Sequence, residues 1–340
     1  MLTLLFLGGL TLRWATSPRT GSGKWVVVEW APGLSFEQGA QLLHDRALVA
    51  DPWAMETYLR LHAAAARPRP GLHLLRDDLS PREVAEYLAR LPSRPRRHVL
   101  LPEGWNHMQI AERLESAGIC PASRFQAVAF EPELVGEWIG AGGSLEGYLF
   151  PDTYEFYVNT DCRRVAETLV SRARRQFSRV MQLHAAEAAA LRREFGWGER
   201  EIVTLASIIE AETGSPDERA LIASVFLNRL RNKDFRPLRS LQSDPTAGYG
   251  CLVAPDDAPS CAGYGHRVTP AIVRDPQNRY NTYRHPGLPP GPISNPGLRA
   301  VEAVLRPATT NYLFFFASGR GHHFFSETFD DHSARIRSSR

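Results

Sequence analysis

The residue with the clearest capacity for chemistry is Glu210, in the stretch LASIIEAETG from Leu205 to Gly214. It directly follows Ile208 and Ile209, and burial against apolar neighbours disfavours the charged form of a carboxyl group. A carboxyl whose pKa is raised toward the working pH suits a general acid. The alternative is a Glu on the solvated face of a helix, which is the commonest environment of this residue type. The stretch therefore predicts a candidate proton donor near the end of a helix.

Two polar stretches downstream could form a binding groove beside this carboxyl. The first is LQSDPT, from Leu241 to Thr246, and the second is RYNTYRHPGLPPGPISNPG, from Arg279 to Gly297. The second is dense in Pro, Gly, Asn and Tyr, so we predict an ordered loop rather than a helix or strand. Aromatic rings beside neutral amides and hydroxyls suit carbohydrate, because sugars stack on aromatic faces and need many hydrogen bonds. A plain connecting loop has the same composition, so composition alone does not separate the two.

Two helices joined by one tight turn are predicted to position Glu210. The first helix begins in WGEREIVTL and carries Glu210 near its end. After Gly214, Ser215 and Glu218 have the spacing of a capping box, with Pro216 at the first helical position. The segment ALIASVFLNRL is apolar nearly all round, which indicates a buried helix. Such a hairpin would hold Glu210 rigidly against the core.

A basic segment of helical periodicity precedes this hairpin. Residues 164–195 carry apolar positions at intervals of three and four, which predicts one long helix that ends near Gly196. A helix of this kind connects domains more often than it performs chemistry. We therefore assign residues 161–200 to a linking helix.

A degenerate tandem repeat is predicted ahead of the linking helix. Gly104 and Gln109 follow Gly33 and Gln38 at one constant offset, and VAETL at residue 165 matches VAEYL at residue 84. Each copy reads as strand, helix, helix, strand, with Ser35 and Ser80 as helix caps in the first copy. The predicted modules are residues 25–95 and residues 96–160.

The second strand of each module is expected to open on a glycine, Gly71 in the first and Gly147 in the second. Modules of this order that open on a hydrophobic strand and a turn containing Pro and Gly resemble the LysM fold. In families that carry it, that fold binds the N-acetylated sugar backbone of peptidoglycan or chitin. The alternative is that the modules serve only as a spacer or scaffold.

Composition excludes several classes of protein. Apolar residues make up 43% and charged residues 23% of the 340 residues, which is typical of globular domains. The net charge of +3 is too small to indicate nucleic acid as a partner, and no basic run is interleaved with aromatic residues. The sequence also lacks the G-x-S-x-G motif of serine hydrolases and the phosphate-binding loop of NTPases.

Four cysteines are present, and two of them bracket a short loop. Cys251 and Cys261 each adjoin a Gly-Tyr-Gly tripeptide, and the turn-forming sequence between them is compatible with a disulfide in an oxidising compartment. No zinc-binding spacing such as C-x-x-C or H-E-x-x-H occurs, so no metal site is predicted. Cys120 and Cys162 are far apart in sequence and are interpreted as small buried side chains.

The first residues, MLTLLFLGGLTL, form an apolar run followed by Arg13 and a polar stretch. We interpret residues 1–20 as a membrane anchor or export segment. The run is shorter than the roughly 20 residues that span a bilayer and lacks a cleavage site, so a start upstream of Met1 would explain its length. A buried N-terminal strand or helix is the alternative.

Six ordered motifs give the sequence a specific resemblance. They are ASIIEAET, FLNRL, LQSDPT with Tyr249, YNTY, GLPPGPISNPG and YLFFFASGRGHHFFSET. Together they look like the endolytic murein transglycosylase family, the YceG-like or MltG-type proteins, and EGYLFPDTY at Glu146 is similar to a further element of that family. The resemblance implies an α+β fold in which tandem LysM-like βααβ modules precede a mixed α/β catalytic domain at residues 201–335.

The resemblance also implies a lyase that cuts the MurNAc-GlcNAc β-1,4 bond of nascent peptidoglycan strands internally and so ends their elongation. Glu210 falls where the family has its catalytic glutamate. The sugar's own C6 hydroxyl would then replace water as nucleophile, which leaves a 1,6-anhydro end and needs only one carboxyl group. The residues carried over as substrate-binding are Glu212, Asn228, Gln242, Ser243, Asp244, Tyr280, Asn281 and Tyr283.

The resemblance implies no cofactor. Its implied setting is the bacterial cytoplasmic membrane, spanned once by the N-terminal segment, with the bulk of the chain outside the cytoplasm. The implied partners are peptidoglycan glycan strands and penicillin-binding protein synthases. The 251–261 loop looks like an insertion relative to the family, and His73 stands where Tyr is usual.

Two other functions stay open. A hydrolytic muramidase needs a second carboxyl group, and Asp244 is the best rival acid for it. A glycan-binding scaffold without activity needs neither carboxyl. Glu212 lies two residues after Glu210, about 200° round a helix, and is not expected on the same face.

Overall fold

The structure is a computed structural model that describes residues 14–17, 21–92, 96–131, 134, 143–319 and 322–338. The chain separates into two compact units, the first ending at Arg96 and the second beginning at Arg97. Most of the predicted N-terminal segment, residues 1–13 and 18–20, lies outside the described residues. Within the part that is described, no helix is both long enough and apolar enough to cross a bilayer.

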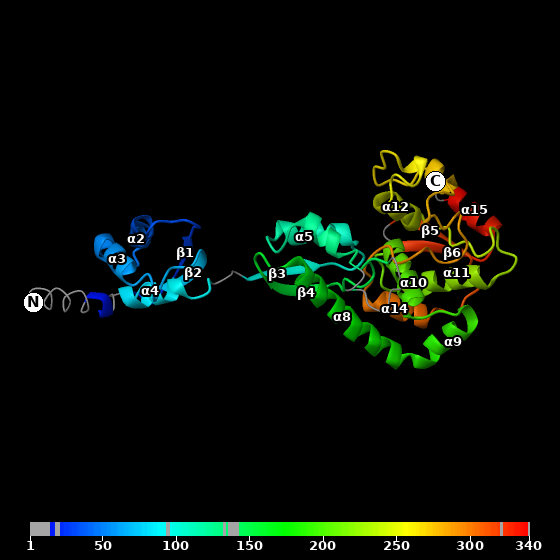
Figure 1. Cartoon of the computed structure of the whole chain (residues 1–340). Helices are drawn as coiled ribbons and strands as arrows, with labels where there is room; N and C mark the ends of the chain where they lie inside the picture. The colour runs from blue at the N-terminus through cyan, green and yellow to red at the C-terminus, as the bar shows by residue number, and fades with distance from the viewer. Residues whose placement is uncertain are drawn as a thin grey trace, which may run out of the picture. The chain divides into compact units, whose positions relative to one another are not determined.

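The first unit has the predicted order of strand, helix, helix and strand, followed by one more helix (Figure 1). Its elements are β1 (Trp25–Trp30), α2 (Phe36–Asp45), α3 (Pro52–Leu61), β2 (Gly71–Arg76) and α4 (Pro81–Ala89). The two strands pair antiparallel, with Trp30 opposite Gly71. Ser35 and Ser80 cap α2 and α4 in complete capping boxes, as the sequence predicts.

The second unit opens on the same order of elements. They are β3 (Arg96–Leu101), α5 (His107–Ser116), α6 (Ala122–Val128) and β4 (Asp152–Tyr157), and β3 and β4 share a two-stranded sheet. Gly33 and Gly104 both take a left-handed conformation, with φ of 80° and 81°. Asn106 and Gln109 form a capping box on α5 just as Ser35 and Gln38 do on α2. The repeated order is thus present, although a likeness to LysM domains is not established by it.

The last strand of the second module starts later than predicted. β4 begins at Asp152, whereas Gly147 lies in a turn with φ of 87°. A Cβ at Gly147 would stand 2.5 Å from Cγ of Pro292, so the segment before the strand packs tightly against the loop that follows YNTY. This close approach ties the module to the helical half of the same unit.

The predicted linking helix is two helices. α8 (Cys162–Leu183) and α9 (Ala185–Phe195) are separated at His184, whose φ of −115° and ψ of 39° are not helical. The continuous helix predicted over residues 164–195 is therefore wrong at this point, because periodicity alone does not register a single residue that leaves the helical conformation. Gly196 ends α9 in the left-handed conformation, as predicted.

The helical half of the second unit is built round α10 (Glu199–Glu212) and α11 (Arg219–Arg231), both buried along most of their length. α14 (Leu298–Leu305) packs against both of them (Figure 1). The remaining elements are α12 (Asp244–Val253), a 3₁₀ turn (Pro259–Cys261), α13 (Pro270–Arg274), the antiparallel strands β5 (Phe314–Gly319) and β6 (His322–Ser326), and α15 (Phe329–Ser338).

One apolar core runs through the second unit. It extends from Val99 of β3 through α8 and α10 to Leu305 of α14. The predicted ranges 96–160, 161–200 and 201–335 therefore all contribute side chains to the same interior. The α+β class is confirmed at this level, with small sheets beside a largely helical body.

The predicted capping box at the start of α11 is wrong. α11 begins at Arg219, and Glu218 makes no capping bond to it. The Glu218 carboxylate instead accepts hydrogen bonds from the backbone N–H of His323, at 2.9 Å, and pairs with the His323 ring nitrogen Nδ1, at 2.7 Å. A contact from a distant strand thus replaces the local one that the Ser-x-x-Glu spacing predicts.

Candidate functional site

A pocket of about 350 Å³ opens where α10 ends and α12 begins. Its volume is at the small end of the range for ligand sites. Four of its residues are among those the sequence predicts, and five are not. The predicted ones are Glu212, Gln242, Asp244 and Tyr283, and the others are Arg229, Phe315, Phe316, Ala317 and His323.

Glu212 is the last residue of α10, at the end of a helix whose macrodipole disfavours a negative charge. Burial raises the pKa of Glu212 from 4.5 to about 7, and the nearby Asp244 carboxylate raises it further, against opposing contributions from Ser243 and Arg229. The Ser243 hydroxyl is buried and has no other hydrogen-bond partner among the described residues. Glu212 is therefore a carboxylic acid that can carry and release a proton near neutral pH.

Asp244 occupies the opposite electrostatic position. It is the first residue of α12, where a negative charge interacts favourably with the helix dipole. The Tyr283 hydroxyl donates a hydrogen bond to Asp244 Oδ1 at 2.9 Å. Burial and the neighbouring Asp244 carboxylate raise the pKa of Tyr283, so its hydroxyl keeps its proton. The pocket thus holds one carboxyl group at a helix C-terminus and one at a helix N-terminus.

Arg229 supplies the positive charge of the pocket and was not predicted. Burial lowers the pKa of Arg229 to about 10, and the neighbouring Glu212 partly opposes this shift. Its Nε donates to the Leu313 carbonyl at 2.7 Å and its Nη1 to the Leu241 carbonyl, so the guanidinium is fixed between the residue before β5 and the segment that leads into α12. The only signal for Arg229 in the sequence is its place in the motif FLNRL, directly after Asn228, the residue of that motif that is predicted to bind substrate.

Glu210 lies in a different environment from Glu212. Its side chain is 4% exposed, its Oε1 accepts from Arg219 at 2.5 Å, and its Oε2 accepts from the backbone N–H of Gly297 at 3.0 Å. Arg219 also approaches Glu103 Oε2 at 3.6 Å, and burial together with Glu210 raises the pKa of Glu103. One carboxylate oxygen of Glu210 is thus engaged in a buried ion pair and the other in a backbone hydrogen bond, and Glu210 does not line the pocket.

The two glutamates therefore point in different directions, as the helix geometry predicts. Glu212 faces α12 and the YNTY loop, whereas Glu210 faces the start of α11 and the loop before α14. The apolar contacts of Ile208 and Ile209 are confirmed, since both are fully buried. They do not isolate Glu210 from charge, because Arg219 is paired with its carboxylate. The apolar pattern of the sequence carries no information about this partner.

Three of the predicted substrate-binding residues make internal structural contacts and are not among the residues that line this pocket. Asn228 donates to the carbonyls of Thr310 and Tyr312, at 2.8 and 3.1 Å, and so anchors the segment before β5. Asn281 is fully buried, and its amide donates to the carbonyls that end α13. Tyr280 packs edge-on against Tyr249 at 5.0 Å, away from the pocket. These side chains shape the loops around the site and do not line it.

Ser243 and Gln242 lead into α12. The Ser243 N–H donates to Thr282 Oγ1 at 3.1 Å, and Gln242 has a φ of 54°, in the left-handed region that few side chains adopt. The bonds between residues 240–246 and Thr282 hold the LQSDPT and YNTY segments together. The prediction that the second segment is an ordered loop is confirmed.

The predicted loop between Cys251 and Cys261 is closed by a disulfide, with Cα atoms 4.9 Å apart. The loop folds over a small apolar cluster of its own, formed with Ala247, Ala258 and Ile272. Because α12 carries both Cys251 and Asp244, the disulfide braces the helix that supplies a carboxyl group to the pocket.

A buried carboxylate joins the second module to this half of the unit. Glu146 is 1% exposed and accepts hydrogen bonds from the Tyr249 hydroxyl at 2.9 Å and from Asn295 Nδ2 at 2.6 Å. On its other side it pairs with His107 Nδ1 at 2.7 Å and accepts from the His107 backbone N–H. Glu146 therefore connects α5 with α12 and with the loop before α14.

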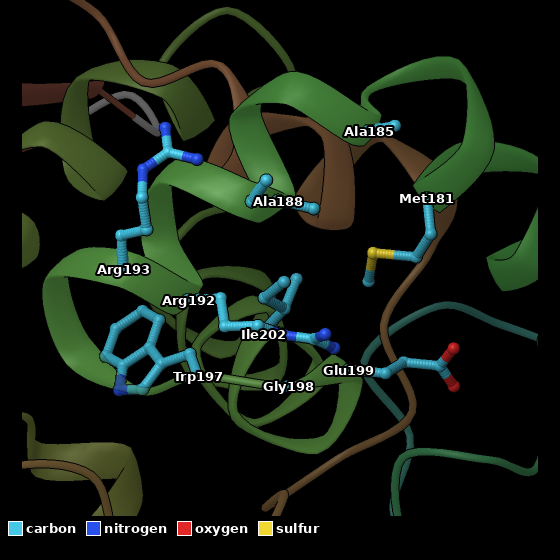
Figure 2. A pocket seen from close by; sticks show the side chains of 10 residues that line it. Met181, Ala185, Ala188, Arg192, Arg193, Trp197, Gly198, Glu199 and Ile202 are labelled. Atoms are coloured by element: carbon cyan, nitrogen blue, oxygen red, sulfur yellow. The ribbon is translucent and has the colours of Figure 1, made fainter.

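A second cavity lies at the bend formed by α8, α9 and α10 and contains none of the predicted site residues. Met181, Trp197 and Ile202 line its apolar wall in a space of about 470 Å³ (Figure 2). Glu199 stands at its edge, and burial raises the pKa of Glu199 to about 7. Among the described residues no group of His, Cys, Asp and Glu is suitable for a metal ion.

The fold and the pocket define an α+β protein in which two βααβ units precede a helical body with a pocket lined by two carboxyl groups. The chain belongs to the YceG-like family, whose model matches residues 28–338.

Similar proteins carry names that agree with this family. An endolytic murein transglycosylase of Bacillus subtilis (strain 168) is 33% identical over 191 residues, which cover 56% of this chain and 46% of that protein. One of Streptococcus pneumoniae serotype 2 (strain D39) is 29% identical over 220 residues, or 62% and 36% of the two chains. A crystal structure of a putative yceG-like protein from Listeria monocytogenes has a TM-score of 0.55 and 26% identity, and covers 92% of this chain and 100% of that one. The chain thus spans less than half the length of the curated relatives it matches.

Proposed function

We propose that this protein is an endolytic peptidoglycan lytic transglycosylase that cuts the MurNAc-GlcNAc β-1,4 bond within nascent strands and leaves a 1,6-anhydro-MurNAc end. Membership of the YceG-like family and the names of the relatives support the class of reaction. The observation that carries the proposal is the pocket carboxyl group of Glu212, with a pKa of about 7 at the end of α10. A single acid of this kind suits a reaction whose nucleophile belongs to the substrate.

The reaction needs one proton donor that later becomes a proton acceptor. Protonated Glu212 donates its proton to the glycosidic oxygen as the bond from that oxygen to the sugar C1 breaks. The C6 hydroxyl of the same sugar then attacks C1, and its proton passes to the Glu212 carboxylate, which restores the acid. Because the nucleophile is already held beside C1, little entropy is lost in reaching the transition state.

Glu212 replaces Glu210 in this proposal for two physical reasons. Glu210 is paired with Arg219 and with a backbone N–H, so neither oxygen is free to reach a glycosidic bond. Glu212 lines an open pocket beside Asp244, whose negative charge favours the protonated form of Glu212. Tyr283 holds Asp244 by a hydrogen bond, Arg229 places a positive charge near Glu212, and Gln242 adds an amide for a sugar hydroxyl.

The pH dependence of cleavage follows from the raised pKa of Glu212. Only the protonated acid can donate, so we expect kcat/KM for purified glycan strands to be flat below about pH 7 and to fall about tenfold per pH unit above it. Asp244→Asn removes a charge that raises the pKa of Glu212, so its activity should begin to fall at a lower pH. An activity that rises between pH 7 and pH 9 would exclude Glu212 as the proton donor.

The second carboxyl group in the pocket keeps a hydrolytic muramidase as the alternative, with Asp244 activating water. Digesting glycan strands and reading the ends by mass spectrometry separates the two. Anhydro-muramyl ends support the lyase, reducing ends support the hydrolase, and intact strands indicate a binding scaffold without activity.

We further propose that the protein acts at the outer side of a bacterial cytoplasmic membrane, to which residues 1–20 anchor it by one span. The apolar sequence MLTLLFLGGLTL and the Cys251–Cys261 disulfide support this location. The same proposal includes three further points. The two βααβ modules contact glycan, the protein acts together with penicillin-binding protein synthases, and its cleavage ends glycan elongation. Fractionation of cells that produce the full chain tests the location.

A further inference from the structure

The two remaining cysteines lie side by side in the second unit. Cys120 is in the turn between α5 and α6, and Cys162 is the first residue of α8. The two residues are 4% and 3% exposed, both are free thiols in this structure, and their side chains interact by a hydrogen bond. The fold has therefore brought together two residues that are far apart in the sequence.

Backbone contacts hold the segment around Cys120 beside the segment around Cys162. The Asn159 N–H donates to the Gly118 carbonyl at 3.0 Å, and Cys162 Sγ lies 3.7 Å from the Pro121 carbonyl oxygen. The two segments thus run alongside one another through the position of the thiols. A disulfide requires such proximity, because its two Cα atoms lie only about 4.4–6.8 Å apart.

We propose that Cys120 and Cys162 form a second disulfide, in addition to Cys251–Cys261. Two thiols and one disulfide of an oxidant, either a protein dithiol oxidase or oxidised glutathione, give the new S–S bond and two thiols on the oxidant. The two electrons pass to the oxidant, and the two thiol protons end on its sulfur atoms. The bond would close a loop that contains α6, Glu146 and β4.

The bond forms while the chain folds. Burial raises the pKa of both thiols in the folded protein, which removes the reactive thiolate and shields it from an oxidant. The partly folded chain, in which both cysteines are accessible, is the state that reacts. The proposal rests on the proposed extracytoplasmic location for its cellular oxidant, whereas its test in vitro is independent of location and of glycan cleavage.

The test is alkylation of the full chain after refolding in detergent with a reduced and oxidised glutathione buffer. The protein is then unfolded without reductant, treated with iodoacetamide, and digested for mass spectrometry. We expect no alkylated cysteine and a cross-linked peptide that contains Cys120 and Cys162. Alkylation of both residues in the refolded wild-type chain would overturn the proposal.

A variant without the other disulfide, Cys251→Ser with Cys261→Ser, isolates the effect on stability. Its melting temperature should fall by about 8 °C when reductant is present during refolding, since a native disulfide stabilises the folded chain against unfolding. Adding Cys120→Ala and Cys162→Ala to this background should abolish that sensitivity. An equal response to reductant in both backgrounds would show that no bond joins Cys120 and Cys162.

Discussion

Glu212→Gln is expected to lower the rate of glycan cleavage by about 10³-fold or more, because general acid catalysis contributes about 10²–10⁴-fold and the proposed mechanism places the transferred proton on Glu212. The amide has almost the same shape as the carboxylic acid, so binding of glycan strands should persist. The rate is measured as anhydro-muramyl ends released from purified strands. Thermal unfolding of the variant should match that of the wild type within a few degrees.

Glu210→Gln is the matched control, two residues away on the same helix. It removes the closer ionic partner of Arg219, a residue that is itself 6% exposed, and leaves this buried charge with only the more distant carboxylate of Glu103, at 3.6 Å. Breaking a buried pair in this way destabilises proteins by about 3–5 kcal/mol. We expect a melting temperature lower by about 10 °C and, below that temperature, cleavage with an unchanged pH profile.

The opposite pattern would return the catalytic role to Glu210. If Glu210→Gln abolished anhydro ends while its melting temperature stayed unchanged, and Glu212→Gln remained active, the ion pair with Arg219 would have to open during catalysis. The two variants together therefore distinguish a proton donor from a structural ion pair, which neither does alone.

The contrast between these glutamates shows what the sequence could and could not predict. Where a helix begins and ends, and which way its side chains point, depends on residues that are close in sequence. The sequence therefore predicts the caps at Ser35 and Ser80 and the end of α9 at Gly196. It also predicts that Glu210 and Glu212 point in different directions. The partner of a carboxylate is not local. Arg219 is nine positions after Glu210 and beyond a turn, and the backbone N–H of Gly297 is farther still.

The lack of information about distant partners also explains the other differences between the predictions and the structure. The Ser215–Glu218 spacing is a valid capping signal, but His323 of β6 competes for the Glu218 carboxylate and prevails. Asn281 carries an amide, which suits a residue that binds sugar. Only the folded loop shows that this amide donates hydrogen bonds to the carbonyls at the end of α13. The break at His184 involves one residue, too few to disturb a periodic pattern. Arg229 was missed because an apolar-looking helix gives no sign that one basic residue faces a pocket.

Polar side chains carry the contacts that join the second module to the pocket. The second module, formed by β3, α5 and β4, shares the apolar core with α10 and α14. Apolar packing of this kind holds the module close to these helices but does not specify its orientation relative to them. Hydrogen bonds have direction, and Glu146 is where donors from α5, α12 and the loop before α14 converge. Since α12 also carries Asp244, the position of that carboxyl group depends on Glu146 through Tyr249.

Glu146→Ala is therefore expected to destabilise the second unit by about 3–5 kcal/mol, because it leaves the Tyr249 hydroxyl and the His107 backbone N–H as buried donors without an acceptor and removes one of the two acceptors of Asn295 Nδ2. The melting temperature should fall by about 10 °C, as measured by calorimetry or circular dichroism. Cleavage measured well below that temperature should also weaken, since α12 loses the bond at Tyr249. Glu112→Ala, on the exposed side of α5, is the matched control and should change stability by no more than about 0.5 kcal/mol.

A double-mutant cycle shows whether Glu146 acts through α12. Tyr249→Phe removes only the hydroxyl that donates to Glu146, so its effect on stability should be smaller and should not add to that of Glu146→Ala. Strict additivity of the two free energies would mean that the Tyr249 bond contributes nothing to the coupling. Equal melting temperatures for Glu146→Ala and Glu112→Ala would contradict the role of Glu146 altogether. A cycle energy of about 1 kcal/mol or more would instead establish that the module and the pocket are joined through this one carboxylate.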